Sequence, residues 1–217
     1  MNKEWSELNK LMQQQINRKD TFLDGIDTLL KLRNEIFDSL IALRDELTNE
    51  QFGEMPFINA NGYHNKSVAY SIWHMFRIED IVAHTLILGD EQVFFAENFK
   101  QKIGSPIITT GNELVKNEIR DFSNTLDISA LYEYCTAVKT STDKLLSELE
   151  YSDLKRKIAP ESRQNLIESS CVSTDENAVW LVDYWCGKDV KGLIKMPFSR
   201  HLIMHTDASI RIKNKFR

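Results

Sequence analysis

The sequence predicts an all-α protein, a four-helix bundle with extra short helices in the connections between the long ones. Apolar residues recur at steps of three and four along nearly every patterned stretch, which is the period of one helix face. The 217 residues include only eight Gly and four Pro, too few for a fold built on many tight turns. A chain of this length can bury a full core, so we expect residues 1–217 to form one domain. Two subdomains divided near residue 105 are the alternative.

The N-terminal quarter predicts two helices. An amphipathic opening helix ends near Arg18, and its apolar face carries Trp5, Leu8, Met12 and Ile16. Asp20 is the expected N-cap of a long helix over about residues 21–48. The apolar stripe of that helix carries Phe22, Ile26, Leu29, Ile36, Leu40, Leu43 and Leu47. Residues 51–65 contain Gly53, Pro56 and Gly62 and are predicted to be a connecting loop.

Residues 66–88 form the most apolar predicted helix, which is hydrophobic on almost every side. Such a helix is typical of the interior of a bundle, and Gly89 is its expected stop. Shorter helical pieces follow over about residues 90–100 and 110–122, separated by Gly104, Ser105 and Pro106.

The C-terminal part predicts two more long helices, over about residues 128–149 and 197–215. Pro197 suits the first turn of the last one. Residues 150–195 lie between them and lack sustained periodicity, apart from a short helix over 178–186 with Trp180 and Trp185. These two side chains either wall a pocket or form a packing surface, which is the commoner case.

Charge and cysteine content narrow the function classes. A formal net charge of −5 argues against nucleic-acid binding, which needs clustered basic residues. The N-terminus lacks the apolar core of a secretory signal, and no apolar run approaches the roughly 18 residues of a membrane span. Cys135, Cys171 and Cys186 are an odd number without C-x-x-C spacing, which favours a reducing cytoplasm over a disulfide framework.

Three of the five histidines are candidate metal ligands. His201 and His205 are four residues apart, so both imidazoles lie on one helix face and can reach one ion, although such pairs also occur as solvated surface residues. His74 lies in the apolar helix and must find a partner if it is buried. It is either a core histidine bonded to a carboxylate or carbonyl, or a third ligand that leaves one coordination position open.

The other two histidines are not expected in this site. His84 is ten residues beyond His74, about 15 Å along the helix and on another face, so Asp80 is its expected partner. His64 lies in the predicted loop beside Asn and Tyr residues.

The two histidine-bearing segments resemble a known family. Residues 67–88, with Trp73-His74 and Arg77-Ile78-Glu79-Asp80, and residues 197–213, with His201 and His205, look like the DinB/YfiT-like superfamily of metalloenzymes. The resemblance implies a four-helix bundle in which His74, His201 and His205 hold a divalent ion, zinc or nickel. It also implies a small-molecule substrate, in some members a low-molecular-weight thiol, and a homodimer. Residues 150–195 exceed the usual connection in the family, so we expect the roof of the pocket to differ.

The residues leave two reaction types open. Leu202 occupies the place of the general-base Glu of zinc peptidases, which disfavours peptidase chemistry. A metal-held thiolate could attack an electrophile, or an activated water could hydrolyse an amide or ester. The resemblance favours a thiol S-transferase over a hydrolase.

Two arginines are candidate substrate contacts. Arg33 and Arg77 could each bind a substrate carboxylate through the guanidinium fork. The simpler interpretation is that each pairs with an acid such as Glu79 or Asp80. The competing function class is a non-catalytic binding or stress-response module, in which any metal only stabilises the fold.

Overall fold

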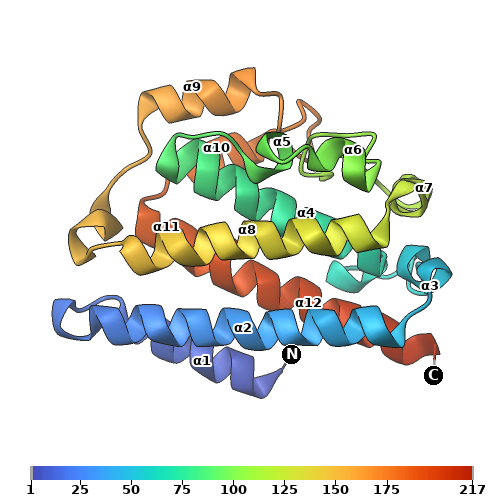
Figure 1. The fold of residues 1–217 in the computed structure, drawn as a ribbon, viewed down its shortest axis with the longest axis horizontal. Helices are drawn as coiled ribbons and strands as arrows, with labels where there is room; N and C mark the ends of the chain where they lie inside the picture. Colours follow the sequence, from blue (N-terminus) through green and yellow to red (C-terminus); the bar gives the residue numbers. More distant parts are fainter. Residues whose placement is uncertain (1, 217) are drawn as a thin grey trace.

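The computed structural model describes residues 2–216, and every regular element in that range is a helix, apart from an isolated bridge between Lys157 and Asp189. The long segments are α2 (Phe22–Glu46), α4 (Val68–Asp80) with a π-helical continuation (Ile81–Leu88), α8 (Ile128–Glu148), and α12 (His201–Lys213) after a π-helical turn (Met196–Arg200). The all-α prediction is therefore confirmed. α4 and α12 run in opposite directions (Figure 1). α2 packs against α8 and α12, and α8 packs against α2 and α4.

The opening helix packs along α2. α1 (Lys3–Gln15) ends three residues before the predicted end, and α2 follows after a 3-10 turn (Lys19–Thr21). The predicted N-cap was wrong, because Asp20 pairs with Arg18 at 2.9 Å and lies inside that turn. The Thr21 hydroxyl donates to the Gln15 carbonyl at 2.8 Å and ties the start of α2 to the end of α1.

The helix predicted over residues 66–88 is present as α4 and its π-helical continuation, and it begins two residues later, at Val68. The Ser67 hydroxyl accepts a hydrogen bond from the Tyr70 amide at 3.0 Å and caps the first turn. Gly89 adopts a left-handed φ of 75° and closes the segment. The change to a π-helix at Ile81 is not visible in the apolar pattern, because every residue from Val68 to Ile87 is buried.

The connections contain short helices. In the predicted loop, Thr48 and Gln51 form a capping box for α3 (Asn49–Gly53), followed by a 3-10 turn (Tyr63–Asn65). The remaining short helices are α5 (Val93–Ala96), α6 (Phe99–Ile103), α7 (Asn117–Thr125), α9 (Pro160–Glu168), α10 (Trp180–Cys186) and α11 (Val190–Lys195). The split near Gly104 and the helix with Trp180 are thus present. Residues 110–116, predicted to be helical, precede α7, and α9 and α11 were not predicted.

The core consists of two apolar clusters that share the long helices. α2 contributes Leu29 to one cluster and Leu32 to the other, and α4 and α8 likewise contribute to both. Within the described part of the chain, no helix combines the length and apolar character needed to cross a membrane. α2 packs against α12 and α8 packs against α4, and the contact between α2 and α8 holds α4 and α12 together where their histidines meet.

Candidate metal centre

His74, His201 and His205 converge on one point, and we refer to them as the three-histidine cluster. One ligand nitrogen from each lies within 4.8 Å of the others. The ring centroids are 5.0 Å apart for His74 and His201, 4.9 Å for His74 and His205, and 4.6 Å for His201 and His205. Within residues 2–216, no other group of three or more metal-ligating side chains gathers in this way. The structure thus brings together the three residues that the sequence singles out.

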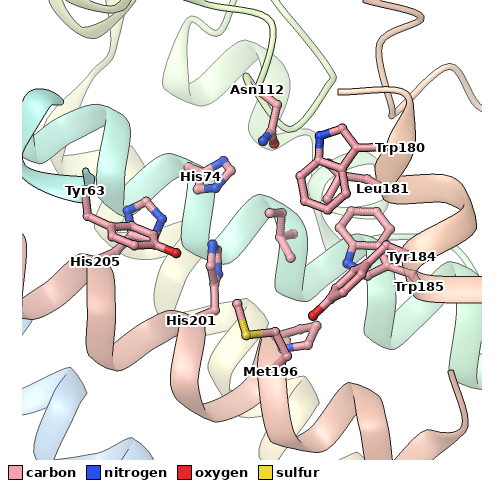
Figure 2. Close-up of a pocket in the computed structure, with 12 residues that line it drawn as sticks. Tyr63, His74, Asn112, Trp180, Leu181, Tyr184, Trp185, Met196, His201 and His205 are labelled. Atoms are coloured by element: carbon pink, nitrogen blue, oxygen red, sulfur yellow. The ribbon is translucent and has the colours of Figure 1, made fainter. Parts of the chain in front are cut away.

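Local helix geometry places all three side chains. His201 and His205 lie on successive turns of α12, directly after the π-helical turn, and His74 faces them from α4. α4 and α12 are antiparallel and staggered, so the beginning of α12 meets the middle of α4 (Figures 1 and 2). All three imidazoles are buried, with exposures of 5%, 6% and 3% for His74, His201 and His205.

His74 is oriented by a backbone carbonyl. Its Nδ1 lies 2.8 Å from the Thr110 carbonyl oxygen, which can only accept, so Nδ1 carries the proton and donates. The other nitrogen, Nε2, is left with its lone pair available for the rest of the three-histidine cluster. Metal-binding histidines characteristically donate their second nitrogen in this way, which fixes the tautomer and the ring plane. The carbonyl partner that one sequence interpretation of His74 named is thus present on Nδ1, and Nε2 is free for the ligand role that the other interpretation requires.

The remaining two histidines carry buried nitrogens without a partner. The Nδ1 atoms of His201 and His205 are buried and make no hydrogen bond. Burial lowers the pKa of His74 to about 4 and the pKa values of His201 and His205 well below their ordinary value, so all three are neutral at pH 7. Unsatisfied buried polar atoms are costly, and neutral imidazoles are the ligand form for zinc and nickel. The donor set thus fits a divalent transition metal ion.

A cavity of about 270 Å³ opens beside the three-histidine cluster and is lined by all three imidazoles. Across it stand Trp180, Tyr184 and Trp185 of α10, which we call the aromatic wall (Figure 2). A mostly apolar cavity with a few polar groups is the usual form of a small-molecule site.

The aromatic wall comes from the segment 150–195, for which the sequence left the role of the tryptophans open. Trp185 is buried, whereas Trp180 is 49% exposed at the mouth of the cavity. The Trp180 Nε1 donates to the Asn177 carbonyl at 2.9 Å, and its ring packs edge-on against Tyr184 at 5.6 Å between centroids. Both tryptophans line the pocket, so the long connection forms part of its wall.

Arg33 lies away from this cavity in a buried ion-pair network. Its Nη1 and Nη2 atoms donate to the two carboxylate oxygens of Glu79 at 3.0 and 2.7 Å, and its Nε donates to Asp143 at 2.6 Å. Nη1 also reaches the Phe198 carbonyl at 3.2 Å, in the turn before α12. Burial alone would lower the pKa of Arg33, but the two carboxylates raise it above its ordinary value. The guanidinium fork is thus occupied by the protein itself, with Glu79 as the acid that the simpler interpretation named.

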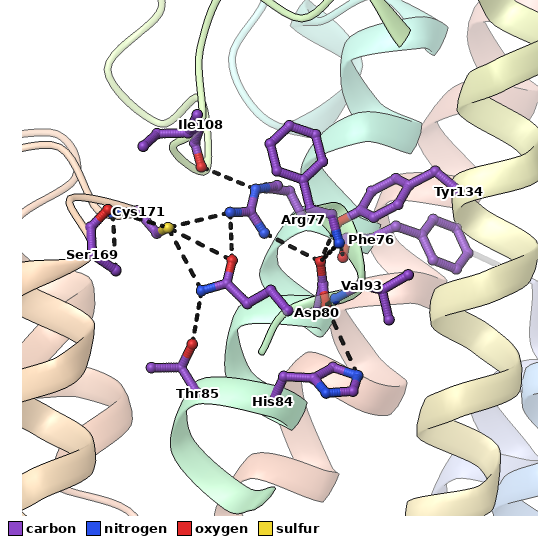
Figure 3. A network of polar contacts seen from close by, with 12 residues as sticks. Phe76, Arg77, Asp80, His84, Thr85, Val93, Ile108, Tyr134, Ser169 and Cys171 are labelled. Carbon is purple, nitrogen blue, oxygen red and sulfur yellow. Dashed lines mark hydrogen bonds and ion pairs between the residues drawn. The ribbon is translucent and has the colours of Figure 1, made fainter. Parts of the chain in front are cut away.

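Arg77 is buried in a second network (Figure 3). Its donors reach the Gln92 side chain at 2.6 Å, the Ile108 carbonyl at 3.0 Å, Cys171 Sγ at 3.3 Å and Asp80 at 3.4 Å. Arg77 therefore fixes the loop that carries Thr110, the partner of His74. Neither Arg33 nor Arg77 lines the cavity beside the three-histidine cluster.

His84 and His64 lie outside the three-histidine cluster. His84 Nε2 lies 4.0 Å from Asp80 Oδ1, one helical turn back as the spacing predicts, and its closer partners are Asp90 at 2.6 Å and Ser141 at 3.0 Å. The turn at Gly89 brings Asp90 back against the helix end, which the spacing along a helix cannot show. The His64 ring contacts the Phe57 ring at 5.4 Å.

Several pocket residues have no signal in the amino-acid sequence. Tyr63 packs edge-on against His205 at 4.8 Å between ring centroids, and Asn112 lies above His74 (Figure 2). Tyr63 lies in the 3-10 turn before α4, and Asn112 lies in the connection between α6 and α7, so only the fold brings them to the site. In comparisons with known proteins, no family model and no curated protein matches this chain.

Proposed function

We propose that this protein is a divalent-metal-binding enzyme of the DinB/YfiT-like type that acts on a small molecule. The observation that carries the proposal is the three-histidine cluster, with two unpartnered buried nitrogens, on the wall of a cavity. The contacts among α2, α4, α8 and α12 support the bundle of that family. Zinc or nickel is the proposed ion, held by His74, His201 and His205.

The open side of the three-histidine cluster supports a catalytic centre rather than a structural one. Structural zinc sites usually have four protein ligands, whereas catalytic sites keep a position for water or substrate. This cluster has three histidines rather than four protein ligands, and all three line the cavity. A divalent ion there would supply Lewis acidity, which favours the thiolate form of a thiol and lowers the pKa of a water molecule.

Thiol transfer is the favoured reaction, and the thiol must come from the substrate. None of the three cysteines lines the cavity; Cys135 and Cys171 are fully buried elsewhere. The protein's own contribution is to hold the reactants beside the three-histidine cluster and to keep water away with the aromatic wall. Hydrolysis of a small ester or amide is the second reaction that the same geometry supports.

The cellular setting belongs to the same proposal. Three free cysteines fit a reducing cytoplasm. A homodimer follows from the family resemblance alone.

The experiment pairs metal analysis with turnover. Protein purified without a histidine tag should contain about one divalent ion per chain, and His201→Ala should lose most of it. His64→Ala is the matched control, because it removes a histidine outside the three-histidine cluster. Zinc- and nickel-loaded samples are then assayed with cysteine or glutathione and monobromobimane, and with p-nitrophenyl esters.

The outcomes separate the two function classes. If the protein turns over a substrate, and His201→Ala abolishes this activity while His64→Ala leaves it intact, the proposal of an enzyme is supported. Bound metal that raises the melting temperature, without turnover on either type of substrate, favours the structural role. Absence of bound ion together with no affinity for added zinc or nickel rejects the proposal.

A further inference from the structure

A second cavity, lined by a lysine, lies next to the cavity beside the three-histidine cluster. The second cavity has a volume of about 300 Å³ and shares Tyr63, His74, Asn112 and His205 with the first. Its distinctive residue is Lys66, which precedes the N-cap of α4. A ligand on the three-histidine cluster would therefore lie between the aromatic wall on one side and Lys66 on the other.

Lys66 is a cation without an acidic partner. Its Nζ lies 5.3 Å from the centre of the Tyr70 ring, and that ring stacks on His74 at 5.5 Å with an interplanar angle of 10°. No ion pair connects Lys66 to a carboxylate within residues 2–216. Burial lowers the pKa of the Lys66 ammonium, and no nearby acid opposes this effect. An anionic ligand would restore the charge partner that the protein does not supply.

Lys66 is the charged residue among those that line the two cavities; outside the lining, the Glu113 carboxylate lies near enough to Tyr70 to add to the burial that raises the pKa of that phenol. None of the residues lining either cavity is an Asp or Glu. The three-histidine cluster is neutral, so a divalent ion would keep its full double charge. Arg200 lies near enough to Tyr63 to oppose the burial that raises the pKa of that phenol, and it adds a further positive charge.

Asn112 adds a directed donor between the two cavities. The Thr110 hydroxyl donates to Asn112 Oδ1 at 2.8 Å, which orients the amide and leaves Nδ2 as the free donor. That NH₂ group has no partner among the described residues, and it lies above His74 in the pocket (Figure 2). Ammonium and amide N–H groups together form a site for a carboxylate.

We propose that the small molecule bound here is an anion, a carboxylate or similar oxyanion attached to a flat aromatic body. Its anionic group would bind between Lys66 and Asn112, and its ring would pack on Trp180 and Tyr184. This inference rests on the proposed function, since it treats the three-histidine cluster as the centre of the same site, and it adds the substrate class.

Calorimetric titration with matched probes tests the inference. The probes are 3-phenylpropionate, its neutral amide 3-phenylpropanamide, the cation 3-phenylpropylamine and hexanoate, titrated into zinc-loaded protein. We expect 3-phenylpropionate to bind about tenfold more tightly than the amide, and the cation to bind most weakly. Hexanoate should bind more weakly than 3-phenylpropionate, because it lacks the ring.

Variants assign each contact. Lys66→Met should reduce affinity for 3-phenylpropionate about tenfold and leave affinity for the amide unchanged. Trp180→Ala should weaken both probes alike, and it should fold because Trp180 is half exposed. Lys144→Met, at an exposed lysine of α8, is the control and should change neither affinity.

Equal affinity for acid and amide, no binding of any probe, or an unchanged acid preference in Lys66→Met would overturn the inference. The metal content of the same samples reports separately on the proposed function. If the protein contains about one ion per chain but does not prefer 3-phenylpropionate over its amide, the metal centre is supported and the substrate class is rejected. If the protein binds no ion but still prefers 3-phenylpropionate, and Lys66→Met removes that preference, the anion site is supported and the metal centre is rejected.

Discussion

Arg33 and Glu79 form a two-pronged ion pair in the core, with side-chain exposures of 1% and 0%. The pair joins α2 to α4 five residues beyond His74, and the same guanidinium reaches Asp143 on α8 and the turn before α12. All four long segments thus meet at one arginine. A buried charge that loses its partner is costly, so the pair holds the helices that carry the three-histidine cluster.

Removal of the Arg33 guanidinium should destabilise the fold without abolishing metal binding. Arg33→Met leaves Glu79 buried and unpaired and should lower the free energy of unfolding by about 3–5 kcal/mol. The double variant Arg33→Met/Glu79→Met should recover part of that loss. Urea denaturation measures both, with Lys144→Met at an exposed pair as a control expected to cost about 0–1 kcal/mol. If Arg33→Met instead keeps its stability and its metal but no longer binds substrate, Arg33 contacts the substrate.

Gly111→Ala should weaken metal binding through Tyr70. Gly111 has a φ of +76°, and an added Cβ would lie 3.1 Å from Tyr70 Cε2, on the ring that stacks on His74. Gly89 has a φ of +75° with nothing within 4 Å, so Gly89→Ala carries the same backbone strain without the contact. Both variants should lose roughly 1–2 kcal/mol of stability. Only Gly111→Ala should bind zinc more weakly in a competition titration, and equal zinc affinities would contradict this account of the Tyr70 contact.

Chelation should lower the melting temperature of the protein. An ion that binds only the folded state at 100 times its Kd adds about 2.7 kcal/mol. For a chain of this size, that corresponds to a loss of about 5–10 °C when the ion is removed. Scanning calorimetry before and after dialysis against EDTA measures the shift. His64→Ala should show the same shift and His201→Ala almost none; a shift of equal size in His201→Ala would place the ion elsewhere.

The metal-free protein should lose stability as pH falls below about 6.5, the ordinary pKa of histidine. Burial lowers the pKa of His74 to about 4 and lowers those of His201 and His205 well below their ordinary value, so below pH 6.5 the unfolded chain binds protons that the folded chain does not. Each buried neutral histidine should therefore cost about 1.4 kcal/mol at pH 5.5 relative to high pH. Urea midpoints of EDTA-treated protein at pH 7.5 and 5.5 measure the loss. His201→Gln should show a smaller loss, and an identical pH dependence would contradict the neutral burial of His201.

The sequence anticipates the parts of the site that depend on helical periodicity. The spacing of His201 and His205, and the position of His74 on an all-apolar helix, already indicate a shared site, because helix geometry fixes which side chains share a face. Their convergence required the stagger of α4 against α12, which no local pattern encodes.

Residues brought in by loops were not predictable in the same way. Thr110 reaches His74 through its backbone carbonyl, and a carbonyl carries no residue-type signal. Asn112 and Tyr63 lie in connections between the longer helices, and the role of Trp180 depends on how α10 packs. The pairing of His84 with Asp90 depends on the turn at Gly89, so the spacing along the helix indicated Asp80, at 4.0 Å, and missed the closer Asp90, at 2.6 Å.

X-ray absorption at the metal edge of zinc-loaded protein tests the central claim most directly. If His74, His201 and His205 share one ion, the spectrum should show three imidazole nitrogens at about 2.0–2.1 Å and one further light ligand. His201→Ala should lose one imidazole from that shell, and His64→Ala should leave it unchanged. A shell with sulfur ligands, or with fewer than three imidazoles in the unmodified protein, would contradict the account.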